Sequence, residues 1–476
     1  MSTVSAISFS DTLDTRRLRI YLGAAAILYL ALVCAMAFRG KLLYSAALIA
    51  IPAILFIITQ PRLALYTFVF LLFIPSAFLP GLNVYLYDVG AVLLILAATL
   101  DILLRDSADS RVPPLAGNFL FVWITLLLTG VFGFSLAASV RPMIRIAVTL
   151  LVFLSIYRLS AKTTITTLLR FFFWICTAHA GIALADFLIA RGQTRSFGLV
   201  TVALDDFAML AAPIGLGFFL WAAPGKSARY ALGTVVTLGG LVATQSRAPL
   251  IFAFAACALL ILLAAKYTRL VSDFDITTPS IGLTPSVSLV RRRVRWVLIL
   301  VAAAILTVFL LKAVLFSGVI GRFERLLTTT PGGTFRLRVV LWTEALKAFW
   351  QHPLMGIGPG NFRNLTEVMP SVRLDPLNYY VRGLSAHNLS LHYLAETGLL
   401  GVTALLALFI NQFRLAFKTW RDSRTGFRID VAVILLTLSA LLLFTTLLEA
   451  AWMWAEFSLV AAFLLALIAR SRQPAA

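Results

Sequence analysis

The chain has 476 residues, of which 61% are hydrophobic, and its formal net charge is +20. The apolar fraction is well above the half or so that soluble domains contain, which excludes a string of ordinary soluble domains. A positive charge of this size on a soluble chain would indicate nucleic acid as the partner. Here most basic residues lie between apolar blocks, so we expect them at a lipid bilayer and expect no nucleic acid.

The apolar residues come in blocks of about 20, the length that crosses the hydrocarbon core of a bilayer. This pattern predicts an all-α fold, a polytopic transmembrane bundle of about 12–14 helices. In chain order, the predicted spans are residues 20–38, 42–59, 63–79, 85–104, 118–137, 143–159, 164–189, 204–222, 229–244, 248–265, 296–315, 387–413, 430–448 and 451–469.

Two longer polar segments divide the predicted bundle. The segment 267–295 is basic and rich in Ser, Thr and Pro, which is typical of a flexible linker. The segment 316–386 is rich in Arg, Gly and Pro and is too long for a simple turn, which favours a functional loop. The predicted parts are a tail (1–19), an N-terminal bundle (20–266), the linker (267–295), one span (296–315), the loop (316–386), C-terminal spans (387–470) and a second tail (471–476).

The distribution of basic residues predicts the orientation of these parts. Arg16, Arg17 and Arg19 precede the first span with no clear cleavage site, which indicates an uncleaved signal anchor. Basic residues favour the cytoplasmic side, and the short loops obey this bias when both termini lie inside. The linker is then cytoplasmic, and the loop 316–386 lies outside. Within that loop, residues 342–350 (WTEALKAFW) predict an amphipathic helix at the membrane interface, which makes the large loop a segment with short helices of its own.

Arginines on the predicted outer side are candidate ligands for an anion. Each could be a solvated loop charge, but as a group they stand where the bias in the short loops disfavours arginine. Because guanidinium forks bind phosphate oxygens and keep their charge, a cluster at headgroup level indicates a lipid-anchored diphosphate. These residues are Arg195, Arg247, Arg322, Arg325, Arg336, Arg338, Arg363, Arg373 and Arg382.

His387 is the candidate general base. Ser385 is a plausible N-cap, which would place His387 in the first turn of the next helix. A helix N-terminus and nearby arginines favour a neutral imidazole, which could accept a proton from a hydroxyl. On a continuous helix Gly398 and Gly401 would share the face of His387, whereas His392 and Glu396 would point away from it. We therefore expect His392 to be a packed polar residue, and we expect no pair between His387 and Glu396.

Other polar groups carry weaker signals. Asp205 and Asp206 could be acid–base groups or metal ligands, but solvated capping residues are the simpler interpretation, and no metal-site spacing occurs. Glu449 and Glu456 are weaker still. Residues 352–362 (HPLMGIGPGNF) predict tight turns and follow no strand, so they are no dinucleotide site. The three cysteines fall within apolar blocks and predict no disulfide.

Several of these segments resemble the O-antigen ligase and O-antigen polymerase superfamily. His387-Asn388 followed by Gly398 and Gly401 is similar to the family signature, and residues 338–342 and 352–362 are similar to its large periplasmic loop. Arg195-Ser-Phe-Gly198, Asp206-Phe-Ala208 and Ser246-Arg247 also look like family positions. The resemblance implies a glycosyltransferase of the bacterial inner membrane that uses no cofactor, metal or nucleotide. Its donor would be a glycan on undecaprenyl diphosphate, and its acceptor either lipid A–core or a growing polysaccharide.

The resemblance also implies roles for single residues. Arg247 and Arg338, together with Arg195, would hold the diphosphate, and His387 would activate the acceptor hydroxyl. Asn388, Gly398, Gly401, Arg336 and Trp342 would support the site. Two alternatives stay open: a transporter or flippase of lipid-linked sugars, to which Arg170, His179 and Asp186 within one span would point, and a structural membrane protein.

Overall fold

The computed structural model describes residues 52–74, 85–104, 112–160, 162–190, 204–272, 288–297, 299, 334–368, 383–423, 429–448 and 455–472. The chain divides into two units, Met1–Gln60 and Pro61–Ala476. The described part of the first unit is a helix over Pro52–Thr59. All further description concerns the second unit.

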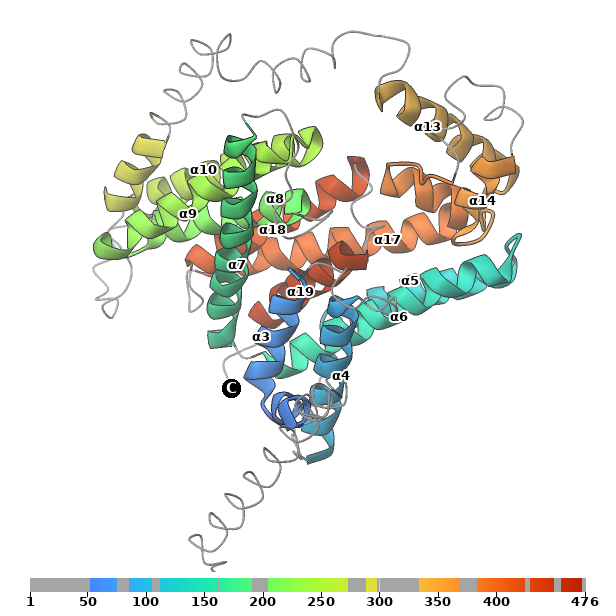
Figure 1. The fold of residues 1–476 in the computed structure, drawn as a ribbon, viewed down its shortest axis with the longest axis horizontal. Coiled ribbons are helices and arrows are strands. Elements are labelled where there is room, and N and C mark those ends of the chain that lie inside the picture. Colours follow the sequence, from blue (N-terminus) through green and yellow to red (C-terminus); the bar gives the residue numbers. More distant parts are fainter. Residues whose placement is uncertain are drawn as a thin grey trace, which may run out of the picture. The chain divides into compact units, whose positions relative to one another are not determined.

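The described part of the second unit is helical, and no strand occurs among its residues (Figure 1). Its labelled helices are α3 (Pro61–Leu71), α4 (Leu86–Leu104), α5 (Ala116–Val131), α6 (Leu136–Leu159), α7 (Lys162–Ile189), α8 (Leu204–Trp221), α9 (Pro224–Ala243), α10 (Arg247–Ser272), α13 (Thr334–Gln351), α14 (Asn361–Val368), α17 (Leu389–Asp422), α18 (Ile429–Leu448) and α19 (Ala455–Ser471).

Among the described residues, seven helices are long and apolar enough to cross a bilayer. Each of the seven overlaps a predicted span, which confirms the polytopic all-α fold. They are α4, α6, α7, α8, α10, α17 and α18. The predicted spans 20–38 and 296–315 lie outside the described residues, apart from residues 296, 297 and 299.

Central and peripheral helices differ in burial. In α8, 89% of the apolar window is buried, whereas in α10 the share is 28%. Apolar side chains of α10 such as Leu262 and Phe254 are exposed, as expected for a face that contacts lipid. The rings of Phe73, Phe172 and Phe207 pack edge to face, with centroids 4.8–6.2 Å apart, and hold α7 against α8.

Three predicted boundaries are wrong. α6 begins at Leu136, seven residues before the predicted span, because Arg141 belongs to the helix rather than to a loop. α17 continues to Asp422, beyond its predicted end at residue 413. The linker is also more ordered than expected: α10 extends into it to Ser272, and residues 288–297 are helical.

One contact explains the order of that linker segment. The guanidinium of Arg293 donates hydrogen bonds to three main-chain carbonyls at the end of α8, which have no partner within the helix. The acceptors are Phe219 O (3.0 Å), Leu220 O (3.0 Å) and Ala222 O (2.6 Å).

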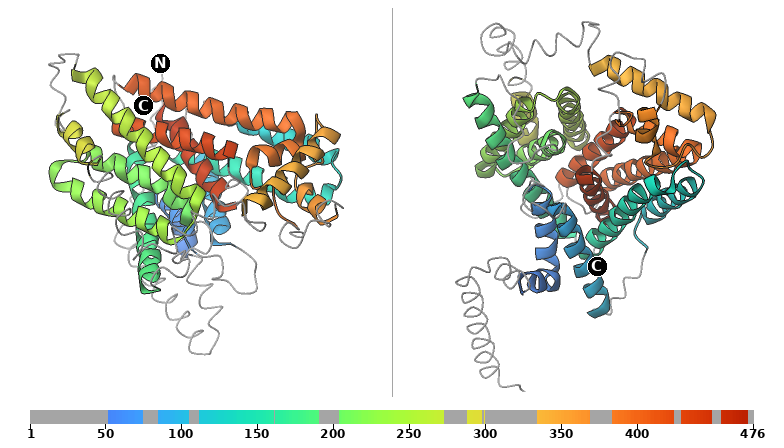
Figure 2. Two further views of the ribbon diagram at one scale, coloured as in Figure 1. Left: turned by 90° about the horizontal axis from the view of Figure 1, so that it is seen from above. Right: turned by 45° about the vertical axis from the view of Figure 1, so that its right-hand side comes forward.

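The loop predicted over residues 316–386 contains two described helices, α13 and α14. α13 packs against α17, which also contacts α5 and α18 (Figures 1 and 2). α17 is therefore packed against helices from three separate parts of the sequence.

Candidate functional site at the start of α17

Asn388 fixes the start of α17. Its side-chain oxygen accepts a hydrogen bond from the Leu391 N–H (3.0 Å), and its side-chain nitrogen donates one to Leu447 O (3.0 Å) in the last turn of α18. The hydroxyl of Ser390 donates a further bond to Thr446 O (3.0 Å). The predicted N-cap at Ser385 is thus wrong. Asn388 caps the helix, since its amide can form hydrogen bonds with the main chains of α17 and α18 at the same time.

His387 immediately precedes this cap rather than lying in the first turn, which corrects the predicted position. Its φ is +48°, a left-handed conformation that costs a residue with a side chain roughly 1–3 kcal/mol. His387 is half-buried between the buried residues Ala386 and Asn388. The neighbours therefore impose the backbone conformation, and strain held in this way clusters at functional sites.

α17 is interrupted at Gly398, where φ is 60° and ψ is −156°. The interruption separates backbone groups from their usual partners one turn away, and the loop over residues 353–358 supplies new ones. Four hydrogen bonds join the loop to the two sides of the break: Ile357 N–H to Ala395 O (3.0 Å), Gly358 N–H to Glu396 O (2.8 Å), Leu399 N–H to Pro353 O (2.9 Å) and Leu400 N–H to Leu354 O (3.3 Å).

Glycines make this close contact possible. A Cβ on Gly398 would lie 2.5 Å from the carbonyl of Leu354, and a Cβ on Gly356 would lie 2.3 Å from the carbonyl carbon of Glu396. The break also overturns the prediction that Gly398 and Gly401 share a continuous helical face with His387. Gly401 instead leaves room for the side chain of Thr397, which a Cβ at position 401 would overlap.

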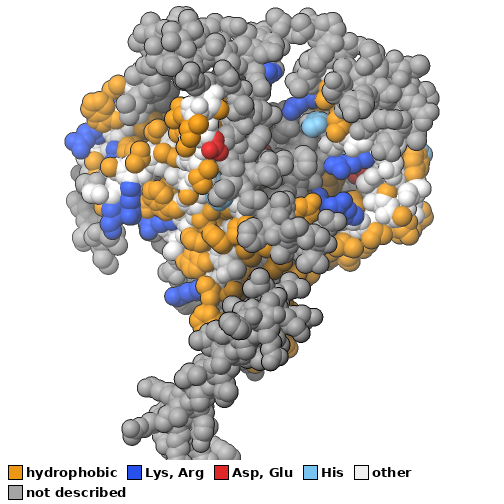
Figure 3. Space-filling view, viewed as in Figure 1, with side chains coloured by type: hydrophobic (Ala, Val, Ile, Leu, Met, Phe, Trp, Pro, Cys, Tyr) orange, Lys and Arg blue, Asp and Glu red, His pale blue; other side chains and the backbone are white. Residues whose placement is uncertain are grey.

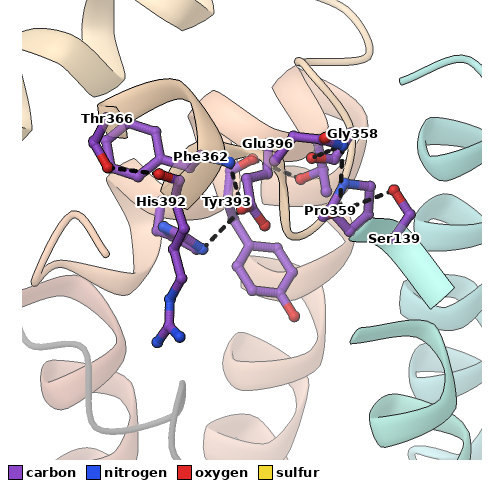
Figure 4. A network of polar contacts seen from close by, with 11 residues as sticks. Ser139, Gly358, Pro359, Phe362, Thr366, His392, Tyr393 and Glu396 are labelled. Atoms are coloured by element: carbon purple, nitrogen blue, oxygen red, sulfur yellow. Dashed lines mark hydrogen bonds and ion pairs between the residues drawn. The ribbon is translucent and has the colours of Figure 1, made fainter. Parts of the chain in front are cut away.

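Glu396 and His392 form a buried polar pair beside the break (Figure 4). Oε1 of Glu396 accepts a hydrogen bond from the Phe362 N–H (3.1 Å) and lies 3.2 Å from Nε2 of His392. The edge of the Phe362 ring meets His392 at a centroid distance of 5.4 Å. His392 is confirmed as a packed polar residue, and the pair joins α17 to the first turn of α14.

The same loop also binds the turn between α5 and α6 (Figure 4). Three hydrogen bonds make the connection: Phe134 N–H to Ile357 O (2.9 Å), Ser139 Oγ to Pro359 O (2.8 Å) and Asn361 Nδ2 to Ser135 O (3.3 Å). We call residues 352–362 the clamp loop, because they hold α17 and the α5–α6 turn together.

α13 brings Arg338 to this region. Leu341 of α13 belongs to one buried hydrophobic cluster with Phe362 and Ala386, and Ala386 is the neighbour of His387. Arg338 is half-buried and lies less than one turn before Leu341. Trp342, also half-buried, follows in the same helix. Arg336 lies in α13 too, but its side chain is outside the described residues.

Of the two other arginines predicted to bind the diphosphate, only one lies among the described residues. Arg247 is the first residue of α10, which packs against α8 and α18. Arg195 lies outside the described residues. A common pocket for Arg247, Arg338 and His387 therefore stays a prediction.

Residues 232–406 match the family model described as O-antigen ligase. Over these residues the chain is similar to the O-antigen ligase family. The match runs from α9 to the middle of α17, and it includes Arg247, Arg338, His387 and Gly398. No curated protein matches the chain. The match and the seven apolar helices together point to a multi-pass bacterial membrane protein of the O-antigen ligase or polymerase type.

The clamp loop is the part of this site that sequence reasoning missed. The sequence predicts tight turns at glycines 356, 358 and 360, and it gives Glu396 no role at the site. The alternate spacing of the glycines was the available signal, because it is typical of a backbone that closely approaches another backbone. Nothing local indicated that the partner would be a glycine 40 residues further on.

Proposed function

We propose that this protein transfers a glycan from undecaprenyl diphosphate to an acceptor hydroxyl at the periplasmic face of the inner membrane. The acceptor is lipid A–core in a ligation or a growing O-antigen or exopolysaccharide chain in a polymerisation. The observation that carries the proposal is the left-handed backbone of His387, fixed directly before the Asn388 cap within the matched segment.

In the proposed reaction, the acceptor oxygen attacks the anomeric carbon while the imidazole of His387 takes its proton. The bond between the anomeric carbon and the diphosphate oxygen breaks, and undecaprenyl diphosphate leaves with the electron pair. Guanidiniums of Arg195, Arg247 and Arg338 stabilise the charge that develops on the leaving group. A single displacement of this kind inverts the anomeric configuration and needs no metal ion.

The remaining predicted residues support this arrangement in the proposal. Asn388 positions His387 through its bonds to α17 and α18. Gly398 admits the clamp loop, and Gly401 allows α17 to continue beyond the break. Trp342 and Arg336 belong to the helix that carries Arg338.

The alternative of a flippase has less support. Two of the three polar residues that would favour it pack against aromatic rings: Arg170 stands over Phe218, 5.1 Å from the ring centroid, and His179 stacks on Phe73 at 5.7 Å. Aromatic packing of this kind gives both groups a structural role within the bundle.

A transfer assay in detergent separates the two functions. The purified full-length chain is mixed with an undecaprenyl-diphosphate-linked glycan and an acceptor glycolipid in micelles that contain a metal chelator. A transferase forms the joined glycan with inverted anomeric configuration, whereas a flippase has no second leaflet to serve and forms none. Absence of product with every acceptor class, alongside flipping in vesicles, would overturn the proposal.

The orientation in the proposal is tested separately. With both termini cytoplasmic, alkaline phosphatase fused after Gly383 should be active, and the same enzyme fused after Ser272 should be inactive. The reverse pattern would place the start of α17 on the cytoplasmic side and exclude a periplasmic reaction.

A further inference from the structure

A pocket of about 190 Å³ lies between α4, α6 and α19, and the proposed reaction uses none of its residues. Both charged and aromatic side chains line it, which is unusual for residues of a membrane bundle. The lining residues are Tyr85, Tyr87, Asp88, Arg141, Ile144, Arg145, Val148, Thr149, Ser458 and Leu459.

Two arginines dominate the charge of this pocket. Arg141 and Arg145 are four residues apart on α6, so their side chains leave the same face about 6 Å apart. Arg141 is exposed and Arg145 is half-buried. With Asp88 as the one acidic residue in the lining, the lining side chains carry a net charge of +1, which favours an anion. Adjacent guanidinium forks suit the oxygens of a phosphate group.

The opposite wall suits a sugar. Tyr85 and Tyr87 stack with ring centroids 4.9 Å apart and planes at 8°. Tyr87 is buried, and the exposed Tyr85 presents flat aromatic surface and a phenol hydroxyl. Hydroxyls of Thr149 and Ser458 complete the lining. The Thr149 hydroxyl donates its hydrogen to Arg145 O (2.8 Å), which leaves its oxygen lone pairs free to accept one.

The pocket lies beside a surface that faces lipid. α4 and α6 both belong to the helices that can cross a bilayer. Ile144, in the lining itself, is 58% exposed, and Leu151 further along α6 is exposed as well. A ligand with a phosphate in the pocket could therefore extend alkyl chains along α6 into the bilayer.

The pocket is also connected to the clamp loop. Ser139, two residues before Arg141, donates the hydrogen bond to Pro359 O. In the space-filling view, several Lys and Arg side chains and one histidine lie near one another on the right of the molecule (Figure 3).

We propose that the pocket between α4, α6 and α19 binds the phosphate group of a membrane-anchored lipid, with Arg141 and Arg145 as its ligands. The Tyr85–Tyr87 pair contacts a sugar when the phosphate belongs to a glycolipid. This site is separate from the arginines proposed to hold the donor diphosphate, and its test does not depend on transfer activity.

Native mass spectrometry of the full-length chain released from detergent tests the site. The probes are phosphatidylglycerol, diacylglycerol, a monophosphorylated glycolipid and the same glycolipid without its phosphate. We expect a larger fraction of the wild-type chain to retain the phosphate-bearing probes than their phosphate-free counterparts. The double variant Arg141→Gln, Arg145→Gln should lose about tenfold or more of this preference, because two charge-assisted contacts disappear.

Three further variants sharpen the result. Arg414→Gln removes an exposed arginine from the far part of α17 and should retain lipid as the wild type does. Arg141→Gln alone changes an exposed side chain and should weaken binding even if the double variant fails to fold. If the pocket recognises a sugar, Tyr85→Ala should reduce binding of the phosphorylated glycolipid and leave binding of phosphatidylglycerol unchanged. If the ligand is an ordinary phospholipid, Tyr85→Ala should bind both phosphate-bearing probes as the wild type does.

Two outcomes would overturn the proposal. One is equal retention of phosphate-bearing probes by the wild type and the folded Arg141→Gln variant. The other is a wild-type chain that retains phosphorylated and dephosphorylated glycolipid equally.

Discussion

The two parts of α17 on either side of Gly398 are held in different ways. The part before the break, Leu389–Thr397, is fixed by polar bonds from Asn388, Ser390 and Glu396 to α18 and the clamp loop. The part after it is regular helix up to Asp422, packed against α18 with one buried polar pair. Directional bonds hold the part beside His387 and the first two residues after the break, Leu399 and Leu400, and apolar packing holds most of the rest. Perturbing the first part should therefore affect transfer, and perturbing the second should affect stability alone.

The largest effect is expected from Gly398→Ala. The new Cβ would meet the Leu354 carbonyl and would have to adopt a positive φ, which together should cost roughly 3 kcal/mol or more of folding free energy. Thermal unfolding followed by circular dichroism measures the loss. Gly117→Ala in α5 is the matched control, because no heavy atom lies within 4 Å of the added Cβ. It should be neutral or stabilise by up to about 1 kcal/mol. Equal melting of the two variants would contradict the clamp.

A somewhat smaller loss is expected from Glu396→Ala. The substitution leaves the buried His392 Nε2 and the Phe362 N–H without their acceptor, which should cost about 3 kcal/mol. Glu396→Gln keeps an acceptor oxygen and should lose less. The transfer rate should fall together with stability, because the pair holds the clamp loop to α17. A Glu396→Ala chain as stable and active as the wild type would show that the clamp is dispensable.

The smallest effect is expected in the second part of α17. Gln412 Nε2 donates a hydrogen bond to the main-chain carbonyl of Ser439 (2.9 Å), the Ser439 hydroxyl donates one to Gln412 Oε1 (2.8 Å), and both residues are fully buried. Because both side chains become apolar and the Ser439 carbonyl lies within α18, where helical bonding supplies a donor, the double variant Gln412→Leu, Ser439→Ala should stay within about 1 kcal/mol of the wild type. Transfer per folded molecule should be unchanged. A loss of transfer without a loss of stability would remove the distinction between the two parts of the helix.

Hydropathy predicted the spans well where the signal is a long apolar run. It failed at the start of α6, because Arg141 lowers the local hydropathy although it stands on the helix. It could not choose between Ser385 and Asn388 as the cap of α17, since both residues cap well and the bond to Leu447 O decides.

The break at Gly398 could not be predicted from the residues around it. A glycine within an apolar run predicts close packing, which is correct here, but a continuous helix was the natural expectation. The backbone bonds from residues 353–358 replace the helical ones, and those partners lie some 40 residues away. Arg338 and His387 can be named as candidates from their types and positions. The clamp loop, which shares a buried cluster with Leu341 and Ala386, cannot be found in this way.

The most direct test of the account replaces the imidazole of His387 in the purified chain. His387→Ala should lower the transfer rate in detergent by about 10²–10⁴-fold, because alanine removes the proposed base. Its melting temperature should stay close to that of the wild type, because the neighbouring residues hold the left-handed backbone at this position. Arg338→Ala should also slow transfer. A His387→Ala chain that transfers glycan at the wild-type rate would contradict the central claim.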